Sequence, residues 1–295
     1  MYNEREKSLA EDTMRYVDFF GTPISKLIVG DNPFNGHSYI TDYVSDEEML
    51  TYHTEERILA AMHQMEELGI NAMLPLADPY IIRILKHYRA NGGKMQFIFQ
   101  LYAPMNVEVS MRQMCEVDAL GAYISGSFVD VRYETGRNEQ TLALLEKLRS
   151  MGIPLGIGTH HPEVVTLSER EGWNTDFYLA CMYNLRRHRE GEESGFLTGK
   201  SKSGVKIYPG DREIALNALK GVSKPIIAFK IFGGGQMLVE KGEKERRAAI
   251  YDAYDTVFSA LKPADCAAFG IFQKHHDQLL EDVAVFEEWA KQEQG

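Results

Sequence analysis

Short runs of apolar residues alternate with longer amphipathic stretches along most of the chain. The runs are continuously apolar, which is the pattern of strands that a parallel sheet buries on both faces. They predict strands at residues 26–30, 71–75, 95–101, 122–126, 153–158, 177–182, 226–231 and 267–271. The pattern leaves open whether the fourth strand extends to Val131.

Between these runs, apolar residues recur at helical spacing, as Ile58, Met62 and Met65 do. The spacing predicts helices within residues 52–69, 79–91, 107–120, 142–151, from 162 onward, and within 209–221, 244–261 and 279–289. Eight strand-then-helix units in roughly 270 residues predict an α/β fold, a closed (β/α)8 TIM barrel. A doubly wound open sheet is the second choice.

We expect residues 1–295 to form this barrel as a single domain, with a polar N-terminal lead-in at residues 1–20. The sixth strand is followed by a polar stretch, residues 183–208, that is too long for an ordinary connection between a strand and a helix. This loop insertion is either an ordered lid over the site or a disordered segment.

Composition restricts the classes of partner. The formal net charge of -11 disfavours binding to nucleic acid and to anionic membranes, because both attract basic surfaces. The N-terminus lacks the apolar run of a secretory signal, so we expect a cytoplasmic protein. Cys115, Cys181 and Cys266 lack the spacing of a disulfide framework or zinc knuckle. The expected partner is a small-molecule substrate, and homo-oligomerisation stays open.

The strand predicted at residues 153–158 leads directly into Thr159, His160 and His161, and Pro162 then opens a helix. Ligands of parallel-sheet proteins bind at the carboxyl ends of the strands, so two adjacent imidazoles there are candidates for function. The alternative is that one histidine is hydrogen-bonded for structural reasons and the other is solvated.

Several segments resemble the aldo-keto reductase superfamily. They are G-I-G-T-H-H-P-E-V-V followed by D-F-Y-L-A-C-M-Y-N-L-R-R, then residues 21–36 and I-A-F-K-I-F-G-G-G at residues 227–235. The resemblance covers roughly residues 21–285 in spacing and implies the barrel fold. It also implies NADPH as cofactor, with an aspartate, a tyrosine, a lysine and a histidine in the barrel mouth. In that family the tyrosine protonates the carbonyl oxygen of the substrate.

Carried over to this sequence, the family motif keeps Tyr80 in L-P-L-A-D-P-Y, whereas Pro75 takes the place of the aspartate. Gln100 stands near the position of the lysine, and Ser125 near that of the histidine. The residues with which the family binds the nicotinamide amide would fall at Thr159 and His160 and near Ala180. Because a tyrosine is a poor acid without a neighbouring cation, we expect weak NADPH binding and no appreciable NADPH oxidation.

The predicted site gathers polar residues at the carboxyl ends of the strands. Asp31 can act as a general base or orient a histidine, and His160 can carry a proton in either direction. Lys230 is a neutralising cation, an amine nucleophile or a side chain that reaches the rim. The candidate catalytic residues are Asp31, Tyr80, His160 and Lys230.

Two further groups complete the prediction. The candidate substrate-binding residues are Asn35, His37, Gln100, His161 and Asn184. A weaker phosphate or cofactor signal consists of Gly233, Gly234, Gly235 and Lys274. A divalent metal held by Asp31, His37 and a histidine is not favoured, because H-x-H and H-E-x-x-H spacings are lacking.

The sequence therefore favours an aldo-keto-reductase-like barrel enzyme acting on a small polar carbonyl or sugar-like substrate. The chemistry would be general acid-base catalysis of the lyase, isomerase or hydrolase type, with no cofactor favoured. One alternative is an NADPH-dependent aldo/keto oxidoreductase with an altered tetrad. Another is a non-catalytic sensor or scaffold that kept the barrel.

Overall fold

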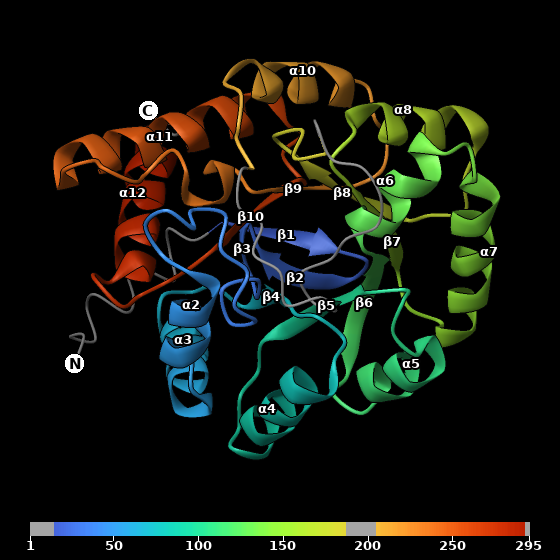
Figure 1. Ribbon diagram of the computed structural model, residues 1–295, viewed down its shortest axis with the longest axis horizontal. Coiled ribbons are helices and arrows are strands. Elements are labelled where there is room, and N and C mark those ends of the chain that lie inside the picture. The colour runs from blue at the N-terminus through green and yellow to red at the C-terminus, as the bar shows by residue number, and fades with distance from the viewer. Residues whose placement is uncertain (1–14, 187–204, 293–295) are drawn as a thin grey trace.

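Eight parallel strands close into a barrel in the computed structural model of the protein, which describes residues 15–186 and 205–292 (Figure 1). Each strand pairs with its neighbours in chain order, and β10 pairs with β3 to close the barrel. The predicted TIM barrel is confirmed, and the open-sheet alternative is wrong. The barrel strands are β3 (Leu27–Gly30), β4 (Ala72–Leu74), β5 (Gln96–Leu101), β6 (Ala119–Ile124), β7 (Leu155–Thr159), β8 (Phe177–Cys181), β9 (Ile226–Phe229) and β10 (Cys266–Gly270).

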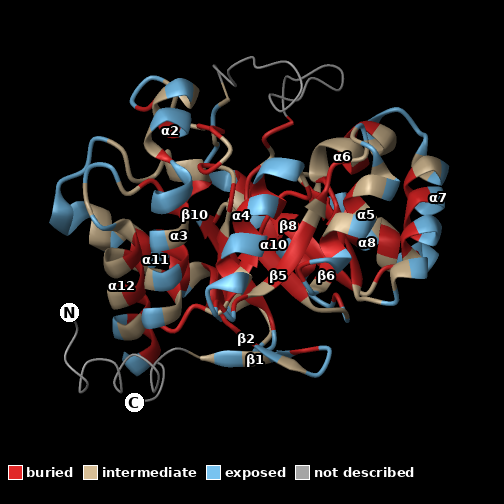
Figure 2. Cartoon of the chain, turned by 90° about the horizontal axis from the view of Figure 1, so that it is seen from below, coloured by how far each residue is buried: buried red, intermediate tan, exposed pale blue. Residues whose placement is uncertain are grey.

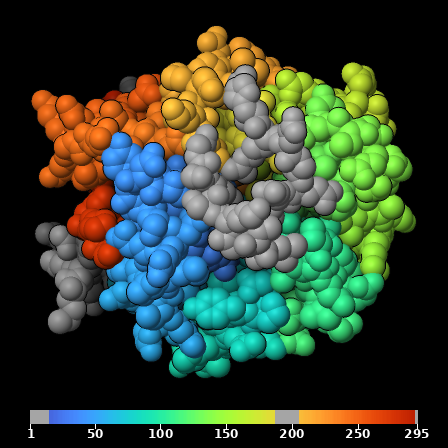
Figure 3. All heavy atoms as spheres, in the orientation of Figure 1, coloured from blue at the N-terminus to red at the C-terminus, as the bar shows by residue number. Residues whose placement is uncertain are grey.

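Helices cover the outside of this barrel and follow one another around it in chain order, from blue through green to orange in Figure 3. Their buried faces carry apolar residues at helical spacing, such as Ile81, Leu85 and Tyr88 in α4. The helices are α2 (Asp46–Tyr52), α3 (Glu55–Glu67), α4 (Pro79–Ala90), α5 (Val107–Cys115), α6 (Gly126–Glu134), α7 (Asn138–Leu148), α8 (Pro162–Glu171), α10 (Gly210–Leu219), α11 (Glu243–Ala260) and α12 (Gln278–Gln292), with short 3-10 turns η1 (Arg149–Met151) and η2 (Gly233–Gly235).

Two predicted elements are wrong in extent. The suggested extension of the fourth strand to Val131 is helix α6, whose inner face buries Val129, Asp130 and Val131. The helix predicted within residues 52–69 is α3, which begins at Glu55, because Thr54 caps it by accepting a hydrogen bond from the Arg57 N–H at 3.4 Å. The preceding helix α2, which ends at Tyr52, was not predicted. Most of the predicted loop at residues 183–208 lies outside the described residues.

An antiparallel hairpin, β1 (Tyr16–Phe19) and β2 (Thr22–Ser25), lies across the amino-terminal end of the barrel (Figure 2). The sequence prediction missed it, since the end of the polar lead-in at residues 1–20 is a strand. Phe19 and Ile24 are buried and pack with Ile28 and Phe177 in the barrel interior. Because this end is filled by side chains, any ligand must enter from the opposite end. Among the described residues, no helix is long and apolar enough to cross a membrane.

Candidate functional site

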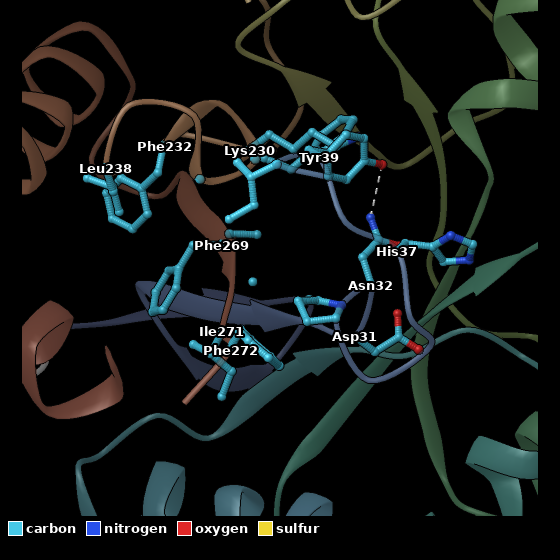
Figure 4. A pocket seen from close by; sticks show the side chains of 18 of the residues that line it. Asp31, Asn32, His37, Tyr39, Lys230, Phe232, Leu238, Phe269, Ile271 and Phe272 are labelled. Atoms are coloured by element: carbon cyan, nitrogen blue, oxygen red, sulfur yellow. Dashed lines mark hydrogen bonds between the residues drawn. The ribbon is translucent and has the colours of Figure 1, made fainter. Parts of the chain in front are cut away.

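A cavity of about 480 Å³ opens at the carboxyl ends of the barrel strands (Figure 4). Its wall comes mainly from the loops that follow β3, β9 and β10, together with residues at the ends of β5, β6 and β7. Five of the predicted polar residues line this cavity: Asp31, His37, Gln100, His160 and Lys230. The barrel therefore brings together side chains that are up to about 200 residues apart in the sequence, as its topology requires.

Asp130 and His160 form a buried pair beside the cavity. Asp130 is fully buried in α6, and one of its carboxylate oxygens lies 2.7 Å from His160 Nδ1. The other oxygen accepts hydrogen bonds from Thr159 Oγ1 at 2.6 Å and from the His160 N–H at 3.1 Å. This carboxylate fixes both the backbone and the ring at the end of β7.

Lys230 extends this pair to a chain of three hydrogen-bonded side chains, Asp130, His160 and Lys230. Its Nζ lies 3.0 Å from His160 Nε2 and sits over the rings of Tyr39 and Phe229, at 4.6 and 4.7 Å from their centroids. Its backbone has φ 57°, in the left-handed region that side chains other than glycine seldom adopt, so the turn after β9 is held in a strained conformation. Within residues 15–186 and 205–292, Lys230 makes no ion pair with a carboxylate.

Burial and the neighbouring charges determine the protonation state of His160 in this chain of three side chains. Burial and, after it, the positive charge of Lys230 lower the pKa of His160 to about 4, although Asp130 acts in the opposite direction. A neutral imidazole has one donor and one acceptor nitrogen, so Nδ1–H donates to Asp130 and Nε2 accepts from the Lys230 ammonium. Among residues 15–186 and 205–292, His160 is the one hydrogen-bond partner of the ammonium, so its other two N–H groups have no acceptor in this part of the chain.

Asp31 is a second acid-base group in the same cavity. Its side chain is buried and accepts hydrogen bonds from the Leu76 N–H at 2.6 Å and from Asn35 Nδ2 at 2.8 Å. Burial raises the pKa of Asp31 to about 7, and the negative charge of Asp78 contributes to the rise. Near neutral pH this carboxyl group can therefore either give or take a proton.

Tyr39 and Tyr123 line the cavity, as does Tyr43, and sequence reasoning assigned none of the three to the site. Tyr123 is buried in β6, and its hydroxyl donates to Gln100 Oε1 at 3.1 Å. Tyr39 accepts a hydrogen bond from Asn32 Nδ2 at 3.3 Å, visible in Figure 4, and its ring faces Lys230. Tyr39 lies nine residues after the end of β3, so a search for polar residues directly at strand ends does not find it.

The placement of Tyr80 at the centre of the mouth is wrong. Tyr80 does not line the cavity and is 45% exposed. Asp78 caps α4 by accepting hydrogen bonds from the N–H groups of Tyr80 and Ile81 at 2.8 and 3.2 Å. Because the helix begins here, Tyr80 lies at the surface, where its partial burial and then the negative charge of Glu55 in α3 raise its pKa.

Three predicted substrate-binding residues also lie outside the cavity lining. His161 Nε2 lies 2.8 Å from Glu134, which also forms an ion pair with Arg186. Asn184 accepts a hydrogen bond from the Arg186 N–H at 3.1 Å. Asn35 instead orients Asp31, as described above. These residues support the wall and do not form it.

No group of three or more metal-ligating side chains occurs in the part of the chain that the structure describes. Asp31, His37 and His160 all line the cavity, but His160 has both ring nitrogens occupied by Asp130 and Lys230. The mixed ligand set considered from the sequence is therefore not assembled in the described residues.

The comparisons with known proteins agree with the barrel. No family model matches the chain, and no curated protein matches it. Among solved structures, aldo-keto reductase AKR11C1 from Bacillus halodurans in its holo form matches with a TM-score of 0.55 and 11% sequence identity, covering 95% of each chain. A protein assigned as a 2,5-diketo-D-gluconic acid reductase B matches with a TM-score of 0.51 and 10% identity, covering 93% of this chain and 86% of the other.

The chain has the aldo-keto reductase fold. The resemblance seen in the sequence is thereby confirmed at the level of architecture. At these identities the likeness does not transfer an activity, because one barrel fold serves many chemistries.

The dinucleotide that the aldo-keto reductase fold implies does not fit the residues carried over from the family. Thr159 is buried and donates to Asp130, His160 is held on both sides, and Ala180 has no polar side-chain group. In η2, a Cβ on Gly233 would meet Ile207 at 2.6 Å, and one on Gly234 would meet Tyr39 at 2.7 Å. These glycines therefore make room for protein side chains.

Lys274, the expected partner of the glycine turn, does not line the cavity. Its Nζ is paired with Glu48 at 2.6 Å. Gly234 and Gly235 do line the cavity, but Gly233 does not. Within the described residues, the predicted phosphate site is therefore not assembled.

Proposed function

We propose that this protein is an enzyme that acts on a carbonyl or sugar-like substrate by general acid-base catalysis. The observation that carries the proposal is the Lys230 ammonium, which lies in the cavity wall beside a neutral imidazole and has no carboxylate partner in the described chain. An isolated cation of this kind is suited to stabilising negative charge on a substrate oxygen.

His160 orients the ammonium by accepting one of its protons at 3.0 Å, and Asp130 holds the imidazole in the required tautomer. Lys230 then donates hydrogen bonds from its remaining N–H groups to the oxygen of the substrate. Because His160 stays neutral, its Nε2 can accept from the ammonium and its ring does not repel the charge of Lys230.

Asp31 supplies the proton transfer. A buried carboxyl group with a pKa of about 7 removes a proton from the carbon next to the carbonyl when ionised and returns one when protonated. Asp31 and Lys230 line the same cavity from the loops after β3 and β9 (Figure 4). This pairing supports lyase or isomerase chemistry through an enolate-like state, and the same groups can assist a hydrolysis.

The fold supports an NADPH-dependent oxidoreductase with altered catalytic groups equally well as an alternative. The similarity to a reductase in its holo form favours it. The poor fit of Thr159, His160, Ala180 and η2 to a dinucleotide weighs against it.

The test measures turnover of a carbonyl panel with and without NADPH, alongside titration of NADPH fluorescence. We expect NADPH-independent turnover that Lys230→Met lowers by about 100- to 1,000-fold, the loss typical of a missing oxyanion donor. Lys220→Met is the matched control, because Lys220 lies at the end of α10 and is exposed. Micromolar NADPH binding together with Lys230-dependent NADPH oxidation would contradict the cofactor-independent enzyme and support the NADPH-dependent oxidoreductase. Absence of any turnover would favour a sensor or scaffold.

A further inference from the structure

The cavity has two chemically different ends (Figure 4). Asp31, His37 and Lys230 mark the polar end described above. At the other end, Phe232, Leu238, Phe269, Ile271 and Phe272 turn their side chains toward the same space. A ligand that fills the whole cavity therefore meets polar groups on one side and an apolar surface on the other.

The apolar end is built from aromatic side chains that pack on one another. The Phe232 ring lies 5.6 Å from the ring of Phe269 and 5.6 Å from that of Tyr254. Phe272 lies 5.2 Å from Tyr52 and belongs to a cluster with Val44 and Met49, which also line the cavity. These contacts tie together the loops after β3, β9 and β10, so the apolar surface is formed before a ligand arrives.

Arg246, a charged residue of the cavity lining, is already paired. Arg246 donates two hydrogen bonds to Glu281 at 2.6 and 2.9 Å. Burial raises the pKa of Asp282, which also lines the cavity, well above its usual value, and this favours the uncharged form of its carboxyl group. A ligand anion that approached Arg246 would compete with Glu281 for its guanidinium group, whereas an apolar group leaves this pair intact.

We propose that the ligand is amphipathic, with a carbonyl or sugar-like head at Lys230 and an aromatic or alicyclic substituent against Phe232, Leu238 and Phe272. The position of the head rests on the proposed function, and that of the substituent rests on the cavity wall alone. The volume of about 480 Å³ lies within the range of cavities that enclose ligands of this size. Edge-to-face packing of the aromatic rings in the wall favours a ring as the substituent.

The test is a ligand-observed NMR titration with acetophenone and acetone, two methyl ketones in which the phenyl ring of the first takes the place of a methyl group of the second. We expect acetophenone to bind at least about tenfold more tightly, because the ring buries apolar area. Leu238→Asn should weaken acetophenone binding by roughly five- to tenfold and leave acetone binding unchanged. Leu142→Asn is the matched control, because Leu142 is 39% exposed on α7 and does not line the cavity.

Equal affinity for the two ketones, or acetophenone binding that Leu238→Asn does not weaken, overturns the inference. If only hydrophilic substrates show Lys230-dependent turnover, the inference of an amphipathic ligand is wrong, whereas the proposed function is supported. If acetophenone binds in a Leu238-dependent manner and no substrate is turned over, the apolar subsite is supported and the proposed function fails.

Discussion

The two ends of the barrel are built from the same eight strands and differ completely in content. At the amino-terminal end, Phe19 and Ile24 of the hairpin are buried among apolar side chains. At the carboxyl-terminal end the strands stop short of a cavity lined by Asp31, His160 and Lys230. One end is filled by the protein itself, and the other leaves space for a ligand.

Polar groups differ between the ends in the same way. Near the amino-terminal end, Asp176 accepts hydrogen bonds from Arg149 at 2.5 Å and from the Leu155 N–H at 2.8 Å, so opposite charges meet. In the cavity, Lys230 faces a neutral imidazole, and burial raises the pKa of Asp31. The comparison teaches that polar groups at the amino-terminal end are matched by opposite charges, whereas Lys230 and Asp31 in the cavity have no such partner in the described part of the chain, which is typical of functional sites.

The largest effect should come from breaking the filled end. Phe19→Ala removes a buried ring that lies 5.1 Å from Phe177, and we expect it to lower the free energy of unfolding by about 3–5 kcal/mol. Denaturant unfolding measures the loss, and activity per folded molecule should stay unchanged. The control is Phe20→Ala, whose ring is 47% exposed, with an expected cost below about 1 kcal/mol. Equal losses of unfolding free energy for both variants would refute the conclusion that the hairpin fills and stabilises the amino-terminal end of the barrel.

Replacing one aspartate at each end of the barrel by asparagine tests the contrast between the two ends. Asp130→Asn places an amide N–H within reach of His160 Nδ1, which favours the tautomer whose Nε2 cannot accept from Lys230. We expect kcat to fall roughly 10- to 100-fold, the usual cost of removing a supporting partner. Asp176→Asn should instead lower stability and leave kcat unchanged. Steady-state kinetics and thermal unfolding of both variants check the pair, and the reverse assignment would contradict it.

The smallest expected effect concerns the pH dependence of stability at the open end. The pKa of Asp31 is about 7 in the folded protein and 3.8 in its ordinary state, so the folded state binds the proton more tightly. This contribution to stability is present at low pH and is lost as pH rises toward about 7. Asp31→Asn should therefore raise the midpoint of thermal unfolding at pH 8 by roughly 2–6 °C, and the gain should shrink toward pH 4.

Circular dichroism at several pH values measures this difference. Asp42→Asn, an exposed carboxylate on the loop after β3, is the control and should show no such trend. A midpoint at pH 8 that Asp31→Asn does not raise would mean that Asp31 is ionised in the folded protein at little cost.

The sequence determined the barrel because each of its strands is a continuous apolar run, whose burial requires cover on both faces. Predicted and observed strand bounds agree closely, as for residues 226–231 and β9 (Ile226–Phe229). Sequence reasoning missed the hairpin because its strands are four residues long and only half buried, as in Tyr16–Phe19. Short strands of mixed polarity carry no periodic signal.

The candidate site was predictable only in part. Asp31, His160 and Lys230 stand directly at strand ends, so the barrel topology brings them into one cavity. Tyr80 follows β4 (Ala72–Leu74) only after a short loop and lies in the first turn of α4, which turns it to the surface. Which way a side chain points after a strand depends on where the following helix begins, and that varies by one or two residues.

The adjacent histidines mark the boundary between what the sequence determined and what the tertiary structure decided. The sequence alone places both His160 and His161 at the end of β7 and before α8. Only the packed barrel brings Asp130 and Lys230 to either side of His160, while His161 turns toward Glu134 outside the cavity. The physical reason is that local pattern fixes backbone conformation, whereas protonation and partner choice depend on burial and on charges from distant segments.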